Sequence, residues 1–151
     1  MKILSLSFAL IFSCMLSSYA QNSSYDEELA KKLGADDYGM KKYVIAFLYR
    51  GDKISEYSEE ERAQLQRGHM DNITRLAEEG KMVLAGPFFG NEDLRGLFFF
   101  NVESIEEAKA LTESDPSIKA GVLKMELKEW YGSAALPLLL ELHSKISKED
   151  I

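Results

Sequence analysis

Four stretches of the chain carry the residue pattern of β-strands. Residues 43–49 and 97–102 are apolar on both alternating faces, which predicts strands that are buried on both sides. Residues 81–89 are also predicted as a strand, and Pro87, which lacks a backbone N–H donor, restricts it to the edge or the end of a sheet. Apolar and charged residues alternate over 122–130, which predicts an edge strand with one buried face.

The first helix is predicted between residues 58 and 79 by its cap and by the spacing of its apolar positions. Ser58 and Glu61 have the S-x-x-E spacing of a capping box, and Gly80 suits the end of the helix. At about 100° per residue, five positions share one inward face: Leu65, His69, Asn72, Ile73 and Leu76. The sequence therefore places the imidazole of His69 inside the fold.

A second helix is predicted between the third and fourth strands. It begins with another capping box, formed by Ser104 and Glu107. Because the residue before a proline is disfavoured in helical conformation, we expect Asp115 and Pro116 to stop this helix. A short amphipathic helix is predicted over residues 137–146, after the last strand.

The predicted order of elements is βαββαβ, which favours an α+β, ferredoxin-like fold with a four-stranded antiparallel sheet. The first and third strands, which are apolar on both faces, take the two central positions. Both helices cover one face of such a sheet, so the apolar residues on the opposite face need another cover. We expect a second subunit to provide it, with the C-terminal helix contributing, and therefore predict a homodimer.

The first twenty residues differ from the rest. Lys2 precedes an apolar run over residues 3–16, and small residues up to Ala20 form a signal-peptidase pattern, so we expect a secreted or periplasmic protein. The run is short for a transmembrane anchor, which needs about 20 apolar residues. A lipoprotein signal ending at Cys14 is the alternative. Four regions follow: a signal peptide at 1–20, an N-terminal arm at 21–40, the α+β domain at 41–131 and a helical tail at 132–151.

Composition and charge narrow the range of partners and chemistries. The net charge of −7 argues against nucleic acids and anionic lipids, and we expect no membrane association after signal removal. Cys14, within the predicted signal peptide, is the single cysteine, which argues against disulfides and thiol chemistry. The two histidines lack metal-ligand spacing, and the G-x-G-x-x-G, P-loop and G-x-S-x-G motifs are absent. We therefore expect neither a metal nor a cofactor.

His69 is the main candidate for chemistry. An inward-facing histidine is either a hydrogen-bonded core residue or a base, because imidazole exchanges protons near neutral pH. Asp115 is its predicted partner, since this fold brings the end of the second helix close to the first half of the first helix. We expect the Asp115 carboxylate at the negative end of the second helix, where an imidazolium would compensate its charge. The alternative is that Asp115 only stops the helix.

Four further residues are predicted to contact a substrate. Gly86, Pro87 and Arg95 flank the second turn, where a guanidinium can hold a carboxylate, and Asn72 shares the inward face of His69. The alternative for Arg95 is an ordinary surface position. Gly68 indicates a close approach to the helix backbone, either by a ligand or by a neighbouring helix, because glycine costs about 1 kcal/mol in a helix interior.

Taken in order, several short motifs resemble those of the YciI-like (YCII-related) family over residues 41–131. They are Gln66-Arg67-Gly68-His69-Met70, Ala85-Gly86-Pro87, Ser104-Ile105-Glu106-Glu107-Ala108, Asp115-Pro116 and Ala120-Gly121. The resemblance implies a dimeric α+β barrel of ferredoxin-like subunits and an active site built around a histidine and an aspartate. These positions match His69 and Asp115, and a Gly-Pro turn near the pocket matches Gly86 and Pro87.

The chain departs from the family pattern at two positions. Family members often carry an arginine where this chain has Gln66, and an aromatic residue where it has Ser117. Both departures concern substrate binding rather than the fold. A few relatives resemble dehydrochlorinases or muconolactone isomerase-like enzymes, which transfer a proton on a small ring compound.

Three functional hypotheses follow. In the first, the protein is a secreted, cofactor-free lyase or isomerase, in which neutral His69 removes a proton from a small, cyclic organic acid while Asp115 orients the ring. In the second, it is a non-catalytic module that binds a small ligand through a hydrogen bond from His69. The third and weakest is haem binding through His69, because other dimeric α+β barrels resemble haem-handling proteins.

Overall fold

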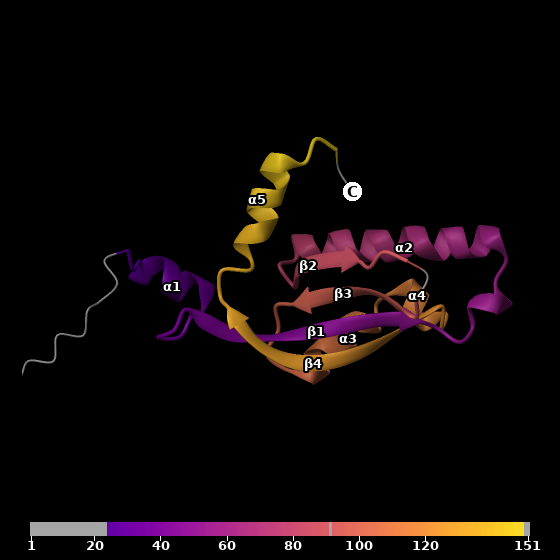
Figure 1. Cartoon of the computed structure of the whole chain (residues 1–151), viewed down its shortest axis with the longest axis horizontal. Coiled ribbons are helices and arrows are strands. Elements are labelled where there is room, and N and C mark those ends of the chain that lie inside the picture. The colour runs from indigo at the N-terminus through magenta and orange to yellow at the C-terminus, as the bar shows by residue number, and fades with distance from the viewer. Residues whose placement is uncertain (1–23, 91, 150–151) are drawn as a thin grey trace, which may run out of the picture.

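The computed structural model describes residues 24–90 and 92–149, so the predicted signal peptide and Cys14 lie outside the described residues. The elements follow one another in this order (Figure 1): α1 (Glu27–Leu33), β1 (Met40–Arg50), the 3-10 turn η1 (Ile54–Glu56), α2 (Glu59–Glu78), β2 (Met82–Pro87), β3 (Leu94–Phe100), α3 (Ile105–Thr112), α4 (Pro116–Lys119), β4 (Leu123–Ser133) and α5 (Leu138–Ile146). Among the described residues, no helix has the length and apolar character needed to cross a membrane.

The four strands form one antiparallel sheet in the order β2-β3-β1-β4. The two strands whose sequences are apolar on both faces, β1 and β3, are central, and β2 and β4 are the edges. Pro87 is the last residue of edge strand β2, where its missing N–H leaves no gap in a central ladder. The structure confirms the predicted α+β, ferredoxin-like fold and the additional C-terminal helix.

The main core lies between one face of the sheet and the helices that cover it. Alternate residues of the central strands point into this core, and α2 and α3 each contribute to it. Its buried members are Val44, Ala46, Leu48, Leu76, Met82, Phe98, Phe100, Val102 and Ala108. The core therefore joins α2 and α3 to the same side of the sheet and fixes the distance between their facing surfaces.

The opposite face of the sheet is also apolar but is only partly covered. Trp130 packs against Tyr43 and Phe99, with ring centroids 6.0 and 5.3 Å apart, and Tyr43 is fully buried. Phe47 and Leu97, which pair across β1 and β3, remain half-buried. Helix α5 projects from the end of β4 (Figure 1), and none of its residues is buried. The predicted second subunit stays a prediction.

Three strands extend beyond their predicted ends because of tertiary contacts. Strand β1 spans Met40–Arg50 instead of residues 43–49, since it pairs with β4 along this whole length. Strand β3 begins at Leu94, three residues before the predicted start, since Leu94 and Gly96 continue the pairing with β1 across a bulge. A Cβ at Gly96 would lie 2.7 Å from the Gly86 carbonyl oxygen, so this close approach requires glycine. Strand β4 continues through Gly132, where the Trp130 ring occupies the space a side chain would need.

The predicted end of the second helix is wrong. Helix α3 ends at Thr112, and Asp115 begins a separate short helix, α4, instead of stopping the previous one. Asp115 itself has the extended conformation expected before a proline, with φ −77° and ψ 124°. Its carboxylate therefore caps the N-terminal, positive end of α4.

Candidate active site

Helix α2 holds His69 against the sheet. The predicted capping box is present: the Ser58 side chain accepts a hydrogen bond from the Glu61 N–H, and the Glu61 carboxylate accepts one from the Ser58 N–H. The side chain of His69 points inward as expected, with only 6% of the residue exposed. Its ring stacks on Phe98 of β3, with centroids 5.7 Å apart and an angle of 27° between the planes.

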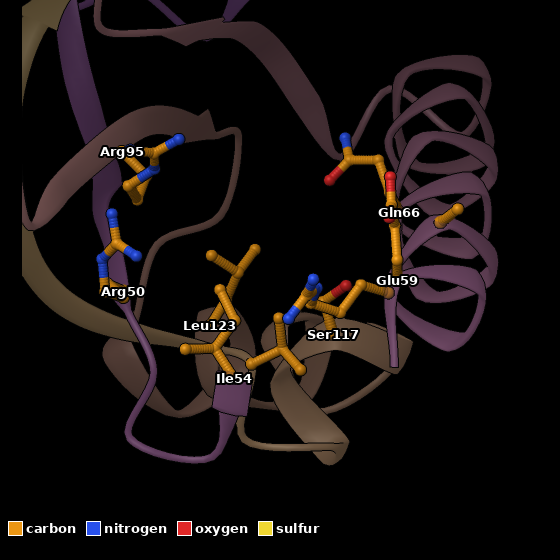
Figure 2. A pocket seen from close by; sticks show the side chains of 10 residues that line it. Arg50, Ile54, Glu59, Gln66, Arg95, Ser117 and Leu123 are labelled. Atoms are coloured by element: carbon orange, nitrogen blue, oxygen red, sulfur yellow. The ribbon is translucent and has the colours of Figure 1, made fainter. Parts of the chain in front are cut away.

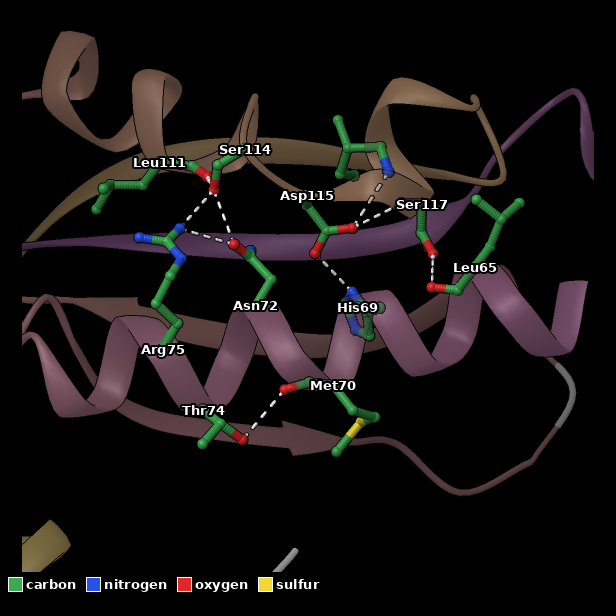
Figure 3. Close-up of polar contacts among 11 residues, drawn as sticks. Leu65, His69, Met70, Asn72, Thr74, Arg75, Leu111, Ser114, Asp115 and Ser117 are labelled. Atoms are coloured by element: carbon green, nitrogen blue, oxygen red, sulfur yellow. Dashed lines mark hydrogen bonds and ion pairs between the residues drawn. The ribbon is translucent and has the colours of Figure 1, made fainter.

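The structure brings His69 and Asp115 together (Figure 3). The His69 Nδ1 lies 2.6 Å from the Asp115 Oδ2, and Asp115 is fully buried. The other carboxylate oxygen, Oδ1, accepts hydrogen bonds from the N–H groups of Ser117 at 2.8 Å and Ile118 at 3.3 Å. A carboxylate can only accept hydrogen bonds, so Nδ1 carries the proton of this contact. In the neutral ring, Nε2 therefore keeps a free lone pair.

The Nε2 atom of His69 is accessible. It makes no hydrogen bond with the described part of the chain, whereas every buried side-chain nitrogen or oxygen there has a hydrogen-bond partner. Nε2 must therefore belong to the 8% of the side chain that is exposed. The ring is held on one side by a buried carboxylate and opens on the other to a molecule from solvent.

Contacts between α2 and α4 fix this geometry. The Ser117 hydroxyl donates a hydrogen bond to the Leu65 carbonyl at 3.1 Å (Figure 3). A Cβ at Gly68 would lie 3.0 Å from Pro116 Cγ, which is tighter than ordinary van der Waals contact. The close approach that Gly68 indicates is therefore made by the neighbouring helix, and it brings Asp115 within reach of His69.

Asn72 is buried one turn after His69 but belongs to a separate polar cluster (Figure 3). Its side-chain oxygen accepts hydrogen bonds from Arg75 at 2.8 Å and from the Ser114 hydroxyl at 2.9 Å. Arg75 also donates to Ser114, at 3.0 Å. These contacts tie α2 to the segment after α3, and the predicted contact between Asn72 and a substrate stays a prediction.

A cavity of about 340 Å³ lies between the first half of α2 and the adjacent end of the sheet (Figure 2), and neither His69 nor Asp115 lines it. Arg95 lines it, whereas Gly86 and Pro87, also predicted as substrate contacts, do not. They form the end of β2 and pair with Leu97 and Gly96. Their proposed contact with a substrate is a prediction that the geometry of the cavity does not support directly.

Two further arginines of this cavity, Arg50 and Arg62, were not singled out from the sequence. Arg62 precedes His69 by seven positions, so both lie on one helical face, and this spacing was a usable signal. Arg50 directly follows the strand predicted over residues 43–49, and no local pattern distinguishes it from a surface residue. Among residues 24–90 and 92–149, no group of three or more His, Cys, Asp or Glu side chains is arranged to hold a metal ion.

The chain is similar to a curated protein in sequence and to a solved structure in fold. The uncharacterized protein YjpA of Bacillus subtilis (strain 168) is 30% identical over 63 residues, which are 42% of this chain and 72% of YjpA. A solved structure, that of 5-chloro-2-hydroxyhydroquinone dehydrochlorinase (TftG) from Burkholderia phenoliruptrix AC1100 in complex with 2,5-dihydroxybenzoquinone, is similar with a TM-score of 0.44. The two chains are 19% identical, and the match covers 60% of this chain and 93% of the other.

The family itself is shown by the sequence model of the YCII-related domain. That model matches residues 42–131, which is more than half of the chain and includes every element from β1 to most of β4. The match contains both His69 and Asp115. The chain therefore belongs to the YCII-related family, as its short motifs predicted.

Proposed function

We propose that the protein is an enzyme in which His69 is the general base that removes a proton from a small organic acid. The observation that carries this proposal is the 2.6 Å contact between the His69 Nδ1 and a buried Asp115, which in the neutral ring leaves Nε2 with an accessible lone pair. The protein satisfies one ring nitrogen and leaves the other accessible to a molecule from solvent, which is the arrangement that a general base requires.

The reaction begins with transfer of a proton from a carbon atom of the acid to Nε2. The C–H bond breaks, and its electron pair stays on the substrate. In a lyase, this pair forms a new double bond as a leaving group departs with its own electrons. In an isomerase, the imidazolium returns the proton to a different carbon atom. Either route needs a ring that is neutral before the step and protonated after it.

Asp115 orients the ring and stabilises its protonated form. Its Oδ1 is fixed by two backbone N–H groups, so Oδ2 faces the ring in one position. A negative charge this close to Nδ1 favours the imidazolium that forms in the step, and burial strengthens the attraction because the local dielectric is low. Phe98 supports the ring face and limits its rotation.

The experiment is a screen of small organic acids for deuterium incorporation from D₂O, followed by NMR. An acid that undergoes exchange with the full chain is identified as a substrate even when its product has not been identified. His69→Gln should lower the exchange rate by about 10²–10⁴-fold, whereas His143→Gln, a change to an exposed histidine of α5, should leave it unchanged. Full exchange in His69→Gln would refute the proposal. Saturable binding of an acid without exchange or product would favour the non-catalytic module.

We also propose that a second copy of the chain covers the open face of the sheet. Supporting this, half-buried Phe47, Leu97 and Phe99 lie on that face, and Leu84 and Trp130 are each 38% exposed. A face with this much apolar surface is typical of an interaction site.

A further inference from the structure

One cavity gathers three of the five arginines in the chain. Arg50 comes from β1, Arg95 from β3 and Arg62 from α2, and all three line the 340 Å³ space described above. Figure 2 shows Arg50 and Arg95 side by side, across the cavity from Gln66 of α2. In a chain with a net charge of −7, such a concentration of guanidinium groups marks an environment suited to an anion.

The positive charge of this cavity is only partly balanced by the protein. Among the described residues that line the cavity, Glu59 is the one acidic residue. Outside the lining, Asp93 lies 3.8 Å from the Arg50 Nε, and both side chains are well exposed to solvent, which weakens this pair. Arg62 donates to the Tyr57 carbonyl at 3.2 Å and Arg95 to the Glu92 carbonyl at 3.4 Å. Each guanidinium has five N–H donors, so most remain available to a ligand.

The three guanidinium groups come from two sides of the cavity, the sheet and helix α2. Arg50 and Arg95 belong to adjacent strands of the sheet, whereas Arg62 belongs to the helix above it. Between them, the lining is apolar and includes Ile54 and Leu123. A ligand that matches this arrangement has an anionic group at each end and a carbon body between them. The volume, at the lower end of the usual range for small-molecule sites, restricts the ligand to a small compound.

The cavity shares neighbouring residues with the proposed catalytic pair, although neither His69 nor Asp115 lines it. Gln66 lines it one helical turn before His69, and Ser117 lines it two residues after Asp115. The Ser117 N–H is itself a hydrogen-bond donor to Asp115. A molecule held by the arginines would therefore lie against α2 and α4, the two elements that carry the pair.

We propose that this cavity binds a small dicarboxylic acid, with one carboxylate held by Arg50 and Arg95 and the other by Arg62. Guanidinium groups can bind carboxylates through two parallel hydrogen bonds, which fixes the orientation as well as the charge of the ligand. The inference rests on the proposed function for the chemistry that follows, and it specifies the substrate class as a small dianion.

The test compares three ligands with the same carbon backbone by isothermal titration with the full chain. Adipate carries two carboxylates, monomethyl adipate one and dimethyl adipate none. Adipate should bind on the order of tenfold more tightly than the monoester, which in turn should bind more tightly than the diester. Equal binding of the three compounds, or no binding of adipate, would overturn the proposal. Tighter binding of inorganic phosphate than of adipate would overturn it too, in favour of a phosphate site.

Variants separate the cavity from the catalytic pair. Arg62→Gln and Arg95→Gln should each weaken adipate binding on the order of tenfold and reduce its advantage over the monoester. Arg67→Gln is the matched control, since it removes the same charge from an exposed position of α2 outside this cavity. His69→Gln should bind adipate like the wild type even where it abolishes exchange. Unchanged binding in both arginine variants would contradict the proposal, whatever the role of His69.

Discussion

Asp115 connects two functions through the two oxygens of one carboxylate. Oδ1 accepts the N–H groups that open α4, and Oδ2 contacts His69. The sequence indicated the pairing because the expected topology places the end of the second helix near the middle of the first. It did not indicate the cap, because the four residues of α4 are too few to show a hydrophobic period and their assignment depends on contacts with α2.

Replacing the carboxylate with an amide should separate these two functions. In Asp115→Asn, the amide oxygen can still accept the backbone N–H groups, whereas the amide nitrogen faces Nδ1 and donates to it. The ring proton then moves to Nε2, which removes the lone pair that acts as base. We expect exchange activity to fall by about 10²–10⁴-fold with little loss of stability. Activity close to wild type would show that the orientation of the ring does not matter.

At the scale of elements, local signals predicted where helices begin and tertiary contacts decided where strands end. The Ser58 and Ser104 caps were predicted from spacing alone, because their hydrogen bonds join residues three positions apart. The extension of β3 to Leu94 and of β4 past Gly132 depends on pairing with β1, whose partners are distant in sequence. A local pattern therefore contains no information about these boundaries.

The cap of α2, the helix that carries His69, should contribute measurably to the stability of the protein. Ser58→Ala removes the acceptor of the Glu61 N–H and should lower the free energy of unfolding by about 1 kcal/mol. Urea denaturation followed by circular dichroism measures this change. Ser55→Ala, an exposed serine of η1, is the control and should have almost no effect. Equal effects of the two changes would contradict the role assigned to the cap.

Because Tyr43 is buried, we expect the protein to lose stability at alkaline pH. Burial raises its pKa from 10.0 to about 12, so the unfolded chain releases the phenolic proton at lower pH than the folded protein. The resulting stabilisation is complete below pH 10 and is lost as the pH rises toward about 12. Urea unfolding across this interval should show a steeper decline for the wild type than for Tyr43→Phe. Parallel declines would show that Tyr43 does not contribute.

At the scale of the whole molecule, the sequence predicted the open face of the sheet but not the full arginine-lined cavity. The sequence predicted an uncovered apolar face, because β1 and β3 are apolar on both sides. It singled out Arg95 but not Arg50 and Arg62, since the three residues meet only when the ends of β1 and β3 approach α2. The family and the fold were predictable, whereas the composition of this cavity was not.

The proposed homodimer predicts a specific response to charge on the open face. Light scattering after gel filtration should give twice the mass of one chain for the wild type. Phe47→Lys places a charge among the residues that face the partner and should shift the protein toward the monomer. Ala110→Lys adds the same charge on the exposed side of α3 and should remain dimeric. A monomeric wild type would contradict the proposed assembly.

The tautomer of His69 tests the proposed role of this residue most directly. Long-range ¹H–¹⁵N NMR at about pH 8 reports which ring nitrogen of a neutral histidine carries the proton, and His143→Gln assigns the remaining signals to His69. We expect a proton on Nδ1 and a free Nε2, with the opposite tautomer in Asp115→Asn. A proton on Nε2 in the wild type, or the same tautomer in both proteins, would contradict the role of His69 as a base oriented by Asp115.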